Sequence, residues 1–445
     1  MIDEINRLRV DLRSVPGGPI SGRVRVPGDK SISHRAIMLG AIAEGRSEIS
    51  GFLEGGDCLA TLGAFRAMGV EIGRHRPGCV SIEGVGRDGL SACARPLDLG
   101  NAGTGMRLLA GLLAGQRFDS TLIGDASLSG RPMGRVIDPL TMMGARIDAD
   151  DGHAPLMIRG GRSLTGIRYA MPVASAQVKS CLLLAGLYAT GQTCVREPMP
   201  SRDHSERMLR SFGADVVDRD GWICIQGGQP LQGLDMDVPA DISSAAFFMV
   251  AASIKPGSDL VLEHVGMNPT RTGVIEILRM MGADITVESN GMSGNEPVAD
   301  LRVRYAPLTG IHIPAALVPL AIDEFPAILI AAACADGETV LTGAAELRVK
   351  ESDRIKAMVD GLTELGIWAV PEADGLTMRG GSLTGGRVQS HADHRIAMAF
   401  TVAGLVAKGP VDILDCANVD TSFPGFVPLA VQAGMRLSMS RGDPA

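Results

Sequence analysis

The stretch Val26–Arg35 combines residue types that suit anion binding. It reads Val-Pro-Gly-Asp-Lys-Ser-Ile-Ser-His-Arg and joins a Gly-Asp turn to a predicted helix start. Backbone N–H groups and the side chains of Lys30, Ser31 and Arg35 are therefore expected to face one anionic group. A Pro-Gly-Asp turn before a capped helix is also a common loop, so the stretch alone leaves both interpretations open.

Polar residues stand at the starts of five further predicted helices that are otherwise nearly uncharged. Ser, Asn and Asp are good helix caps, and capping is the favoured explanation for Asp241, Ser243 and Ser244. Capping does not explain Lys30, Arg35, Gln177, Lys179 and Arg395. If the helices of each domain point the same way, their positive ends would form a cleft for anions. The starts read Asn101-Ala102-Gly103-Thr104 with Arg107; Ser175-Ala176-Gln177 with Lys179; Asp241-Ile242-Ser243-Ser244; Asp323-Glu324-Phe325-Pro326; and Asp393-His394-Arg395.

Basic residues also occupy the loops before a second set of helices. A charged run is usually a solvated face, and that alternative stays open for Arg135, Arg271 and Arg348. The chain nevertheless carries a net charge of −8, so basic groups at many equivalent loops indicate a multiply charged ligand. Arg would bind carboxylate or phosphate through two parallel hydrogen bonds. The loops are Arg131-Pro132-Met133-Gly134-Arg135, Ser201-Arg202-Asp203-His204, Asn268-Pro269-Thr270-Arg271 and Leu347–Arg354.

Paired carboxylates beside a lysine supply acid–base chemistry. Asp323 and Glu351, with Lys350, could take a proton from a hydroxyl and give one to a carbon without a cofactor. The sequence has no Ser-His-Asp order, no Walker loop and no Gly-x-Gly-x-x-Gly opening a helix, so hydrolysis of nucleotides and hydride transfer lack their usual signatures. Eight cysteines form no Cys-x-x-Cys pair and have no His at metal spacing. We therefore predict free thiols, no disulfide and no metal site.

Composition limits the remaining function classes. With 445 residues, 45% of them hydrophobic, the chain predicts two domains or three. No apolar run approaches the ~20 residues of a membrane helix, and the acidic start of the chain is unlike a signal peptide, so a cytoplasmic location is expected. The negative charge and an aromatic content of 3% argue against nucleic-acid binding.

One supersecondary unit repeats six times along the chain. Six predicted helices close on an apolar-Gly-apolar step, and each glycine stands where a helix end favours a left-handed residue. These glycines are Gly69, Gly144, Gly213, Gly282, Gly366 and Gly434. Between them lie helices of Ala, Gly, Leu and Met that must be buried on nearly all sides. They are Ser31–Ala43, Gly103–Ala114, Ala176–Ala189, Ser243–Ser253, Pro326–Ala335 and Arg395–Ala407.

Six units in one chain of this length suggest two domains of three units. Val26–Ser31 is echoed by Val238–Ser243, 212 residues later, and both stretches are candidate crossovers between domains. The prediction is an N-terminal domain of residues 23–238 and a C-terminal domain of residues 1–22 plus 239–445. A strand at Leu8–Val10 would complete the strand set of the C-terminal domain.

Taken together, these motifs closely resemble the 5-enolpyruvylshikimate-3-phosphate synthase family, the enolpyruvyl transferases of the shikimate pathway. The resemblance covers about residues 23–430. It implies an α/β fold of two domains, each with three βαβαββ units arranged as an inverted α/β barrel, and an active site in the cleft between them. The motifs are Gly28–Arg35, Gly100–Thr104, Arg131–Met133, Ser175–Ser180, Asp323-Glu324, Leu347–Arg354 and Asp393–Arg395.

The resemblance also implies a reaction and its residues. The 5-hydroxyl of shikimate 3-phosphate would add to C2 of phosphoenolpyruvate while C3 takes a proton, and the resulting ketal would lose phosphate. Proton transfer is expected from Lys30, Asp323 and Glu351, in a monomer without a cofactor. The expected shikimate-3-phosphate set is Lys30, Ser31, Arg35, Ser175, Ala176, Gln177, Arg202, Asp323 and Lys350. The expected phosphoenolpyruvate set is Lys30, Gly103, Arg131, Gln177, Glu351, Arg354 and Arg395.

Two positions bear on how this chain compares with the family. Thr421 stands where many members carry a Lys before Thr-Phe-Pro, which places the chain nearer the divergent bacterial branch. Gly103 is a position at which some tolerant bacterial members carry Ala, so inhibition by the herbicide glyphosate is expected here. Two alternatives remain: enolpyruvyl transfer to a UDP-sugar, whose enzymes typically carry a Lys-Asn pair and a loop Cys not found here, and a catalytically silent anion-binding protein.

Overall fold

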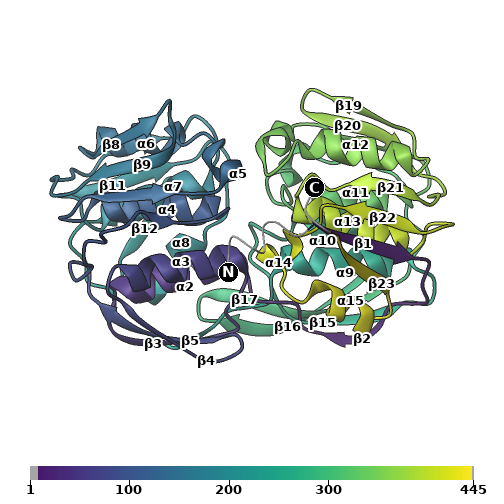
Figure 1. Cartoon of the computed structure of the whole chain (residues 1–445), viewed down its shortest axis with the longest axis horizontal. Helices are drawn as coiled ribbons and strands as arrows, with labels where there is room; N and C mark the ends of the chain where they lie inside the picture. Colours follow the sequence, from purple (N-terminus) through teal and green to yellow (C-terminus); the bar gives the residue numbers. More distant parts are fainter. Residues whose placement is uncertain (1–8, 443–445) are drawn as a thin grey trace. The chain divides into compact units, whose positions relative to one another are not determined.

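The computed structural model describes residues 9–442, which divide into two compact units (Figure 1). The N-terminal unit contains Gly28–Val238 and the short segment Met292–Glu296. The C-terminal unit contains the chain up to Pro27, Pro239–Gly291 and the residues from Pro297 onward. Each unit has its own hydrophobic core. Among the described residues, no helix is long and apolar enough to cross a membrane.

The N-terminal unit contains three repeats, each with an inner helix, an outer helix and a sheet. The inner helices are α2 (Lys30–Ile42), α4 (Gly103–Ala114) and α7 (Ala176–Gly186), and the outer helices are α3 (Gly56–Ala67), α6 (Gly134–Met142) and α8 (His204–Ser211). A short helix, α5 (Ala126–Ser129), precedes α6. The sheets have the orders β14 (Met236–Asp237), β3 (Glu44–Ser50), β5 (Cys79–Val85), β4 (Glu71–Arg76); β6 (Leu97–Asp98), β7 (Ser120–Ile123), β9 (His153–Arg159), β8 (Arg146–Asp150); and β10 (Arg168–Ala170), β11 (Gln192–Arg196), β13 (Trp222–Gln226), β12 (Val216–Arg219).

The C-terminal unit repeats this plan. Its inner helices are α9 (Ile242–Ile254), α11 (Phe325–Ala333) and α13 (His394–Gly404), and its outer helices are α10 (Gly273–Met280), α12 (Arg354–Glu364) and α15 (Phe426–Gln432). Shorter elements are η1 (Ala315–Leu317), η2 (Ala345–Val349) and α14 (Val419–Ser422). The sheets have the orders β16 (Asp284–Ser293), β17 (Glu296–Arg304), β15 (Asp259–Gly266), β2 (Ser21–Val24); β18 (Glu338–Leu341), β20 (Gly375–Arg379), β19 (Ala369–Glu372); and β21 (Gly386–Gln389), β22 (Val411–Leu414), β1 (Arg9–Val15), β23 (Arg436–Gly442).

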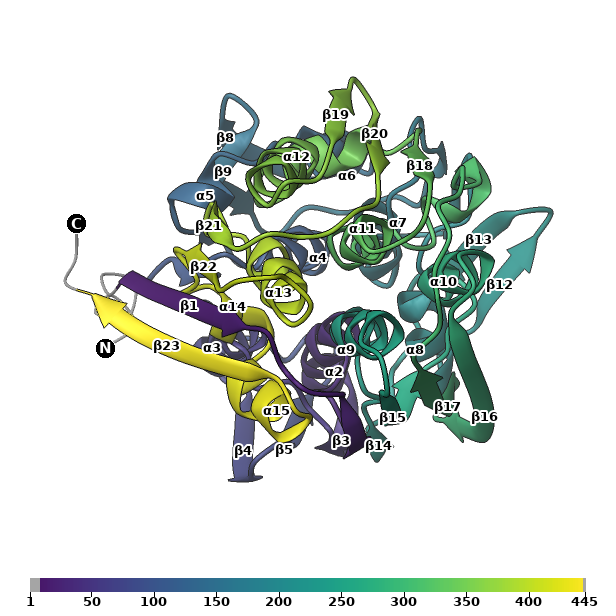
Figure 2. The same cartoon turned by 90° about the vertical axis from the view of Figure 1, so that its right-hand side faces the viewer.

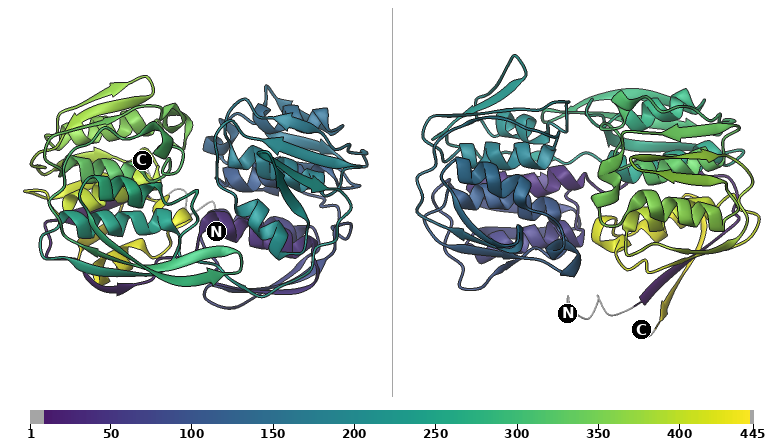
Figure 3. Two further views of the ribbon diagram at one scale, coloured as in Figure 1. Left: turned by 180° about the vertical axis from the view of Figure 1, so that it is seen from behind. Right: turned by 90° about the horizontal axis from the view of Figure 1, so that it is seen from above.

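Within each unit the inner helices form the core and the sheets cover them. Figure 2 shows α9, α11 and α13 together at the centre of the C-terminal unit, and Figure 3 shows the helix and sheet layers of both units from two further sides. Every residue of α9 is buried, and so are Ile32–Ile42 of α2. A helix that is apolar on all sides is stable only when neighbours surround it, so the composition of these helices explains their central position.

The helix-closing glycines adopt the predicted conformation. All six have positive φ, from 84° at Gly366 to 118° at Gly434. A side chain at these positions would be strained, because the left-handed region is costly for residues with a Cβ. The repeated glycine therefore turns each outer helix into the strand that follows it.

The N-terminal segment supplies two strands to the C-terminal unit. β1 lies between β22 and β23 and pairs antiparallel with both, while β2 pairs parallel with β15. The division between units falls after Pro27, whereas the sequence predicted it after residue 22. The difference arises because β2, which belongs to the C-terminal unit, extends across the expected boundary. The segment Met292–Glu296, at the turn between β16 and β17, groups with the N-terminal unit and was not foreseen. Of the predicted strand at Leu8–Val10, Leu8 lies outside the described residues.

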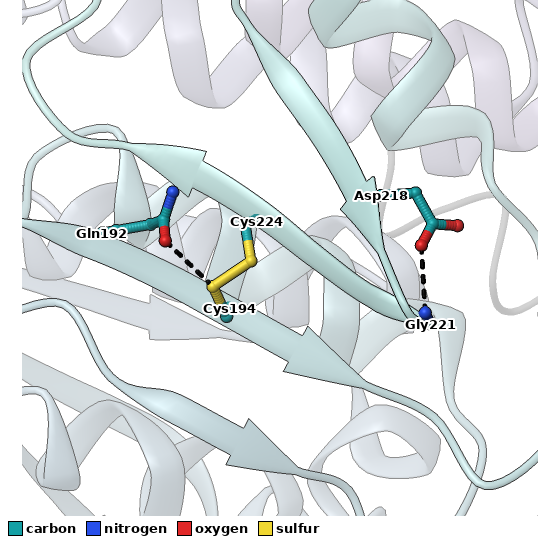
Figure 4. The surroundings of a disulfide bond; sticks show 5 residues. All are labelled: Gln192, Cys194, Asp218, Gly221 and Cys224. Atoms are coloured by element: carbon teal, nitrogen blue, oxygen red, sulfur yellow. Dashed lines mark hydrogen bonds between the residues drawn. A yellow bond between two sulfur atoms is a disulfide. The ribbon is translucent and has the colours of Figure 1, made fainter.

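A disulfide joins Cys194 of β11 to Cys224 of β13 (Figure 4), so the prediction of no disulfide is wrong at this pair. The two residues face each other in the antiparallel ladder, with Cα atoms 4.1 Å apart. Their separation of 30 residues in the sequence gives no local pattern, and only the strand register brings them together. The other six cysteines are free, as predicted from the sequence.

Thiol titration tests this disulfide. Protein denatured without a reductant is expected to expose six thiols, and protein reduced before titration is expected to expose eight. A crosslink across about 30 residues restricts the unfolded chain and contributes roughly 3 kcal/mol, so reduction should also lower the melting temperature. Cys194→Ser with Cys224→Ser should melt like the reduced wild type. Eight thiols in the unreduced protein would contradict the pairing.

Candidate active site

The start of α2 holds a lysine that is oriented by a carboxylate. Asp29 caps the helix by accepting a hydrogen bond from the Ile32 N–H at 2.9 Å. Lys30 is the first helical residue, and its Nζ lies 3.0 Å from Oδ2 of Asp57 in α3. The Lys30 ammonium is partly exposed at the positive end of a helix, which is where an anion would bind.

Arg35 lies one turn further along α2 and is buried. Its Nε donates to Oγ of Ser205 at 2.7 Å, and one terminal nitrogen donates to Oγ of Ser180 at 2.8 Å. The other terminal nitrogen donates to the carbonyl oxygen of Ser31 at 2.8 Å. Burial lowers the pKa of Arg35 to about 10. Arg35, which the sequence predicted as a ligand residue, therefore connects α2 to α7 and α8. It also holds the carbonyl oxygen of Ser31 at the start of α2.

Lys179 of α7 has an internal role that the sequence did not show. Its Nζ lies 2.7 Å from a carboxylate oxygen of both Glu197 and Glu206, and its side chain is 3% exposed. Burial would lower the pKa of Lys179, but the two carboxylates outweigh it and raise the pKa. Glu197 also accepts a hydrogen bond from the Ser201 N–H at 3.2 Å. This buried cluster fixes the loop that carries Arg202.

The starts of α4 and α7 meet through side chains. Oε1 of Gln177 accepts a hydrogen bond from Arg107 at 2.9 Å, and Nε2 of Gln177 donates to Oγ1 of Thr104 at 2.9 Å. Ser175 caps α7 through the Val178 N–H, and Ala176 is the first helical residue. Gln177 is therefore held in one orientation at the junction of the two helix starts.

Two guanidinium groups flank Gly103. A Cβ built on Gly103 would lie 3.1 Å from a terminal nitrogen of Arg131 and 3.2 Å from one of Arg107. The sequence placed Gly103 and Arg131 in the candidate site, and the structure brings them together. Arg107 was noted only as a neighbour of the helix start, yet it contacts both Gln177 and this glycine. Its position one helical turn after Gly103, on the same face, was the signal available in the sequence.

In the C-terminal unit, Arg354 connects three carboxylates. Its Nε lies 2.8 Å from Asp393, and its terminal nitrogens lie 2.6 Å from Glu351 and 3.4 Å from Asp323. The side chain is 1% exposed. Burial would lower the pKa of Arg354, but Asp393, Glu351 and Asp323 together raise it. Burial would likewise raise the pKa of Asp393, and Arg354 keeps that pKa below its usual range.

Lys350 and Arg395 complete this cluster. Nζ of Lys350 lies 3.5 Å from Oδ1 of Asp323. Arg395 donates to the carbonyl oxygen of Asp323 at 3.0 Å, and its own N–H is capped by Asp393. The structure therefore gathers all five predicted residues of this unit, Asp323, Lys350, Glu351, Arg354 and Arg395, around the starts of α11, α12 and α13.

Other polar residues at helix starts have internal partners. Arg271 donates to Oγ of Ser243 at 2.6 Å and lies 3.3 Å from Asp241 and 3.4 Å from Glu324, all of them buried. This pairing agrees with capping and packing at the start of α9. Arg348 lies 2.7 Å from Asp353 and donates to backbone carbonyl groups. These positions therefore have a structural explanation without a ligand.

Thr421 lies in α14, and its Oγ1 donates to the carbonyl oxygen of Asn418 at 2.7 Å. Asn418 donates to the carbonyl oxygen of Ala392 at 2.6 Å. Ala392 and His391 have φ near 55°, a conformation that costs free energy for residues other than glycine. The segment that contains Thr421 is thus tied to the turn before α13 by neutral hydrogen bonds.

Similarity to known proteins shows the family to which this chain belongs. The family model described as EPSP synthase (3-phosphoshikimate 1-carboxyvinyltransferase) matches residues 15–429. This chain belongs to that family. It is 66% identical to the 3-phosphoshikimate 1-carboxyvinyltransferase of Alkalilimnicola ehrlichii over 430 residues, which cover 96% of each chain. It is 65% identical to the enzyme of that name from Methylococcus capsulatus, over 96% of this chain and 98% of the relative. The resemblance stated from the motifs is confirmed.

Solved structures confirm the predicted fold class. The EPSP synthase of Acinetobacter baumannii matches with a TM-score of 0.88 and 56% identity, over 97% of this chain and all of that one. The enolpyruvyl transferase NikO of Streptomyces tendae matches with a TM-score of 0.78 at 17% identity, over 98% of this chain and all of that one, and supports the fold alone. The chain thus has the two-domain inverted α/β fold of six repeated units. In the described residues five of the units have the four strands of the expected βαβαββ pattern, and the sheet of β18, β20 and β19 has three.

His34 makes the stability of the folded protein depend on pH. It is fully buried, its Nδ1 lies 2.8 Å from Oγ1 of Thr61, and burial lowers its pKa to about 4. Between about pH 6.5 and pH 4 the unfolded chain takes up a proton that the folded protein does not. Stability should therefore fall as the pH drops through this range, by up to about 3 kcal/mol from this residue.

The variant His34→Gln keeps a hydrogen-bonding side chain that does not titrate. Unfolding of both proteins, followed by circular dichroism at pH 7.5 and pH 4.5, should show a smaller loss of stability in the variant. The same loss in both proteins would show that His34 is not the titrating group.

Proposed function

We propose that this protein transfers the enolpyruvyl group of phosphoenolpyruvate to the 5-hydroxyl of shikimate 3-phosphate and releases phosphate. Its relatives of 62% to 66% identity over nearly the whole chain are named for this activity. The observation that carries the proposal from the structure is the cluster around Arg354, in which two carboxylates and Lys350 stand beside cations at helix starts. Both substrates are small polyanions, which suits these positive helix ends.

We further propose that residues of both units bind the same pair of substrates. The shikimate-3-phosphate set would be Lys30, Ser31, Arg35, Ser175, Ala176, Gln177, Arg202, Asp323 and Lys350. The phosphoenolpyruvate set would be Lys30, Gly103, Arg131, Gln177, Glu351, Arg354 and Arg395. Support comes from the family motifs that carry these residues and from the clustering, within each unit, of the residues that this unit contributes to the two sets. Arg35 would act mainly by holding Ser31, to which it already donates a hydrogen bond.

The chemistry needs one proton removed from a hydroxyl and one delivered to C3, and one proton must leave C3 again when phosphate departs and the double bond is restored. Asp323 and Glu351 would exchange these protons with the substrates, together with Lys30. Arg354 touches both carboxylates, so negative charge that moves between them stays close to one fixed cation. Fixed cations of this kind stabilise a charged transition state because they need no rearrangement during the reaction.

The activity is tested by phosphate release from phosphoenolpyruvate with shikimate 3-phosphate as acceptor. A parallel reaction with a UDP-sugar acceptor separates the sister activity, and the expected result is turnover with shikimate 3-phosphate alone. No release with either acceptor would indicate the catalytically silent alternative. A single chain in solution, a cytoplasmic location and the absence of nucleic-acid or membrane partners remain predictions.

Removing a proton-transfer carboxylate should slow the reaction more than it weakens binding. Glu351→Gln and Asp323→Asn are each expected to lower kcat by about 10²- to 10⁴-fold, with a smaller change in KM for phosphoenolpyruvate. Glu364→Gln, an exposed change at the end of α12, is the control and should behave like wild type. Wild-type kcat in either carboxylate variant would remove that residue from the mechanism.

Gly103→Ala tests the pocket beside the two guanidinium groups. The added methyl would meet Arg131 and Arg107 at 3.1 and 3.2 Å, so both side chains must shift by a few tenths of an ångström. Glyphosate is longer than phosphoenolpyruvate, and the variant should lose inhibition by glyphosate with a smaller rise in KM for phosphoenolpyruvate. Gly63→Ala is the matched control because its Cβ would enter open space on α3. An inhibition constant in wild type no lower than in Gly103→Ala would contradict this account.

A further inference from the structure

The direction of the Arg131 guanidinium is set by Asn101. One terminal nitrogen of Arg131 donates to Oδ1 of Asn101 at 2.6 Å. The same nitrogen also lies 3.3 Å from Oγ of Ser127 in α5. Asn101 stands two residues before Gly103, so this contact places the arginine against the start of α4. An arginine side chain is long and flexible, and a fixed acceptor is needed to hold it in one place.

The amide of Asn101 is in turn oriented by Asp125. Nδ2 of Asn101 donates to Oδ2 of Asp125 at 2.8 Å. A guanidinium can only donate hydrogen bonds, whereas an ionised carboxylate can only accept them. An amide between these two groups satisfies both only when its oxygen faces Arg131 and its NH₂ faces Asp125. The carboxylate of Asp125 therefore selects the amide orientation that presents an acceptor to Arg131.

Asp125 is itself firmly anchored. Its Oδ1 accepts the Leu128 N–H at 2.8 Å and caps α5, and its own N–H donates to the carbonyl oxygen of Gly100 at 2.9 Å. Gly100 has a φ of 54°, which glycine adopts without strain. The turn after β7 and the turn before α4 are thus joined on both sides of the carboxylate. Hydrogen bonds to the backbone at Leu128 and at Gly100 therefore fix the position of Asp125.

We propose that Asp125 is a positioning residue for the reaction and acts on Arg131 through Asn101. The chain Asp125, Asn101, Arg131 sets the position of a cation that would bind phosphoenolpyruvate, so its disruption should weaken that substrate's binding and leave the acid–base groups intact. This inference rests on the proposed function, in which Arg131 contacts phosphoenolpyruvate.

The variant Asp125→Asn removes the acceptor while keeping a side chain that can cap α5. The new amide can offer its oxygen to the Leu128 N–H only by turning its NH₂ toward Asn101. Asn101 must then reverse its amide to avoid two facing donors, which turns its NH₂ toward Arg131. We expect KM for phosphoenolpyruvate to rise about tenfold, with kcat within about twofold of wild type.

The variant Asn101→Asp tests the same chain from its centre. Alone, it sets two carboxylates side by side in place of the 2.8 Å hydrogen bond, and KM for phosphoenolpyruvate should rise. Combined with Asp125→Asn it restores an acceptor toward Arg131 and a donor toward the new carboxylate, with the same total charge. The double variant should recover most of the wild-type KM, which two independent structural defects would not do.

Controls separate this inference from the proposed function and from misfolding. Asp138→Asn, an exposed change on α6, should leave both kinetic constants unchanged. Melting temperatures identify any variant that is poorly folded. Arg131→Ala should raise KM for phosphoenolpyruvate at least as much as Asp125→Asn does.

The outcomes are distinct. If Arg131→Ala leaves KM unchanged, the assignment of Arg131 in the proposed function is wrong. If Arg131→Ala raises KM but Asp125→Asn does not, the positioning role of Asp125 is wrong and the proposed function stands. The inference would also be wrong if the fold-increase in KM of the double variant equalled the product of the fold-increases of the two single variants. The two residues would then act independently, and the hydrogen-bond chain would not explain the rise in KM.

Discussion

The structure depends on neutralising cations at the starts of buried helices. A charge taken out of water without a partner costs several kcal/mol, and the positive end of a helix adds to that cost for a cation. Three of these cations have a carboxylate of their own unit nearby: Lys30 has Asp57, Lys179 has Glu197 and Glu206, and Arg354 has Asp393. Arg35 instead donates to two serine hydroxyls and a backbone carbonyl. These pairs allow a chain with a net charge of −8 to concentrate positive charge at the helix starts without a bound anion.

The same pairing fixes the geometry of the proposed site. Asp393 caps α13 through the Arg395 N–H and holds Arg354, so one carboxylate aligns two arginines from different helices. Arg354 reaches Glu351 and Asp323, the two groups proposed to move protons. In the N-terminal unit, the carboxylate of Asp125 orients the amide of Asn101, and the amide oxygen in turn holds the guanidinium of Arg131. Residues outside the proposed substrate-binding sets thus determine where the residues of those sets can lie.

Repeats and family were readable from the sequence because both are local patterns. The helix-closing glycines such as Gly69 needed only their neighbours to be interpreted, and the inner helices needed only their composition. Contacts between residues far apart in the sequence could not be predicted from local patterns. The pairing of Cys194 with Cys224 follows from strand register, and the burial of Lys179 between two glutamates follows from packing of α7 against a loop and α8. The sequence showed only that capping does not explain Lys179, because an internal partner far along the chain cannot be read from spacing. The role of Asn101 was hidden for the same reason, since a good helix cap and a side chain that orients an arginine look alike in sequence.

The central claim is that groups of the protein add a proton to C3 of phosphoenolpyruvate and later remove one. It is tested most directly by running the reaction in deuterium oxide and analysing the enolpyruvyl ether by proton and deuterium NMR. Protonation at C3 makes a methyl group that carries one solvent deuteron, and loss of either isotope from it regenerates the vinyl group. The account predicts deuterium in the vinyl CH₂ of the product. Formation of ether and phosphate with no deuterium at that carbon would contradict it.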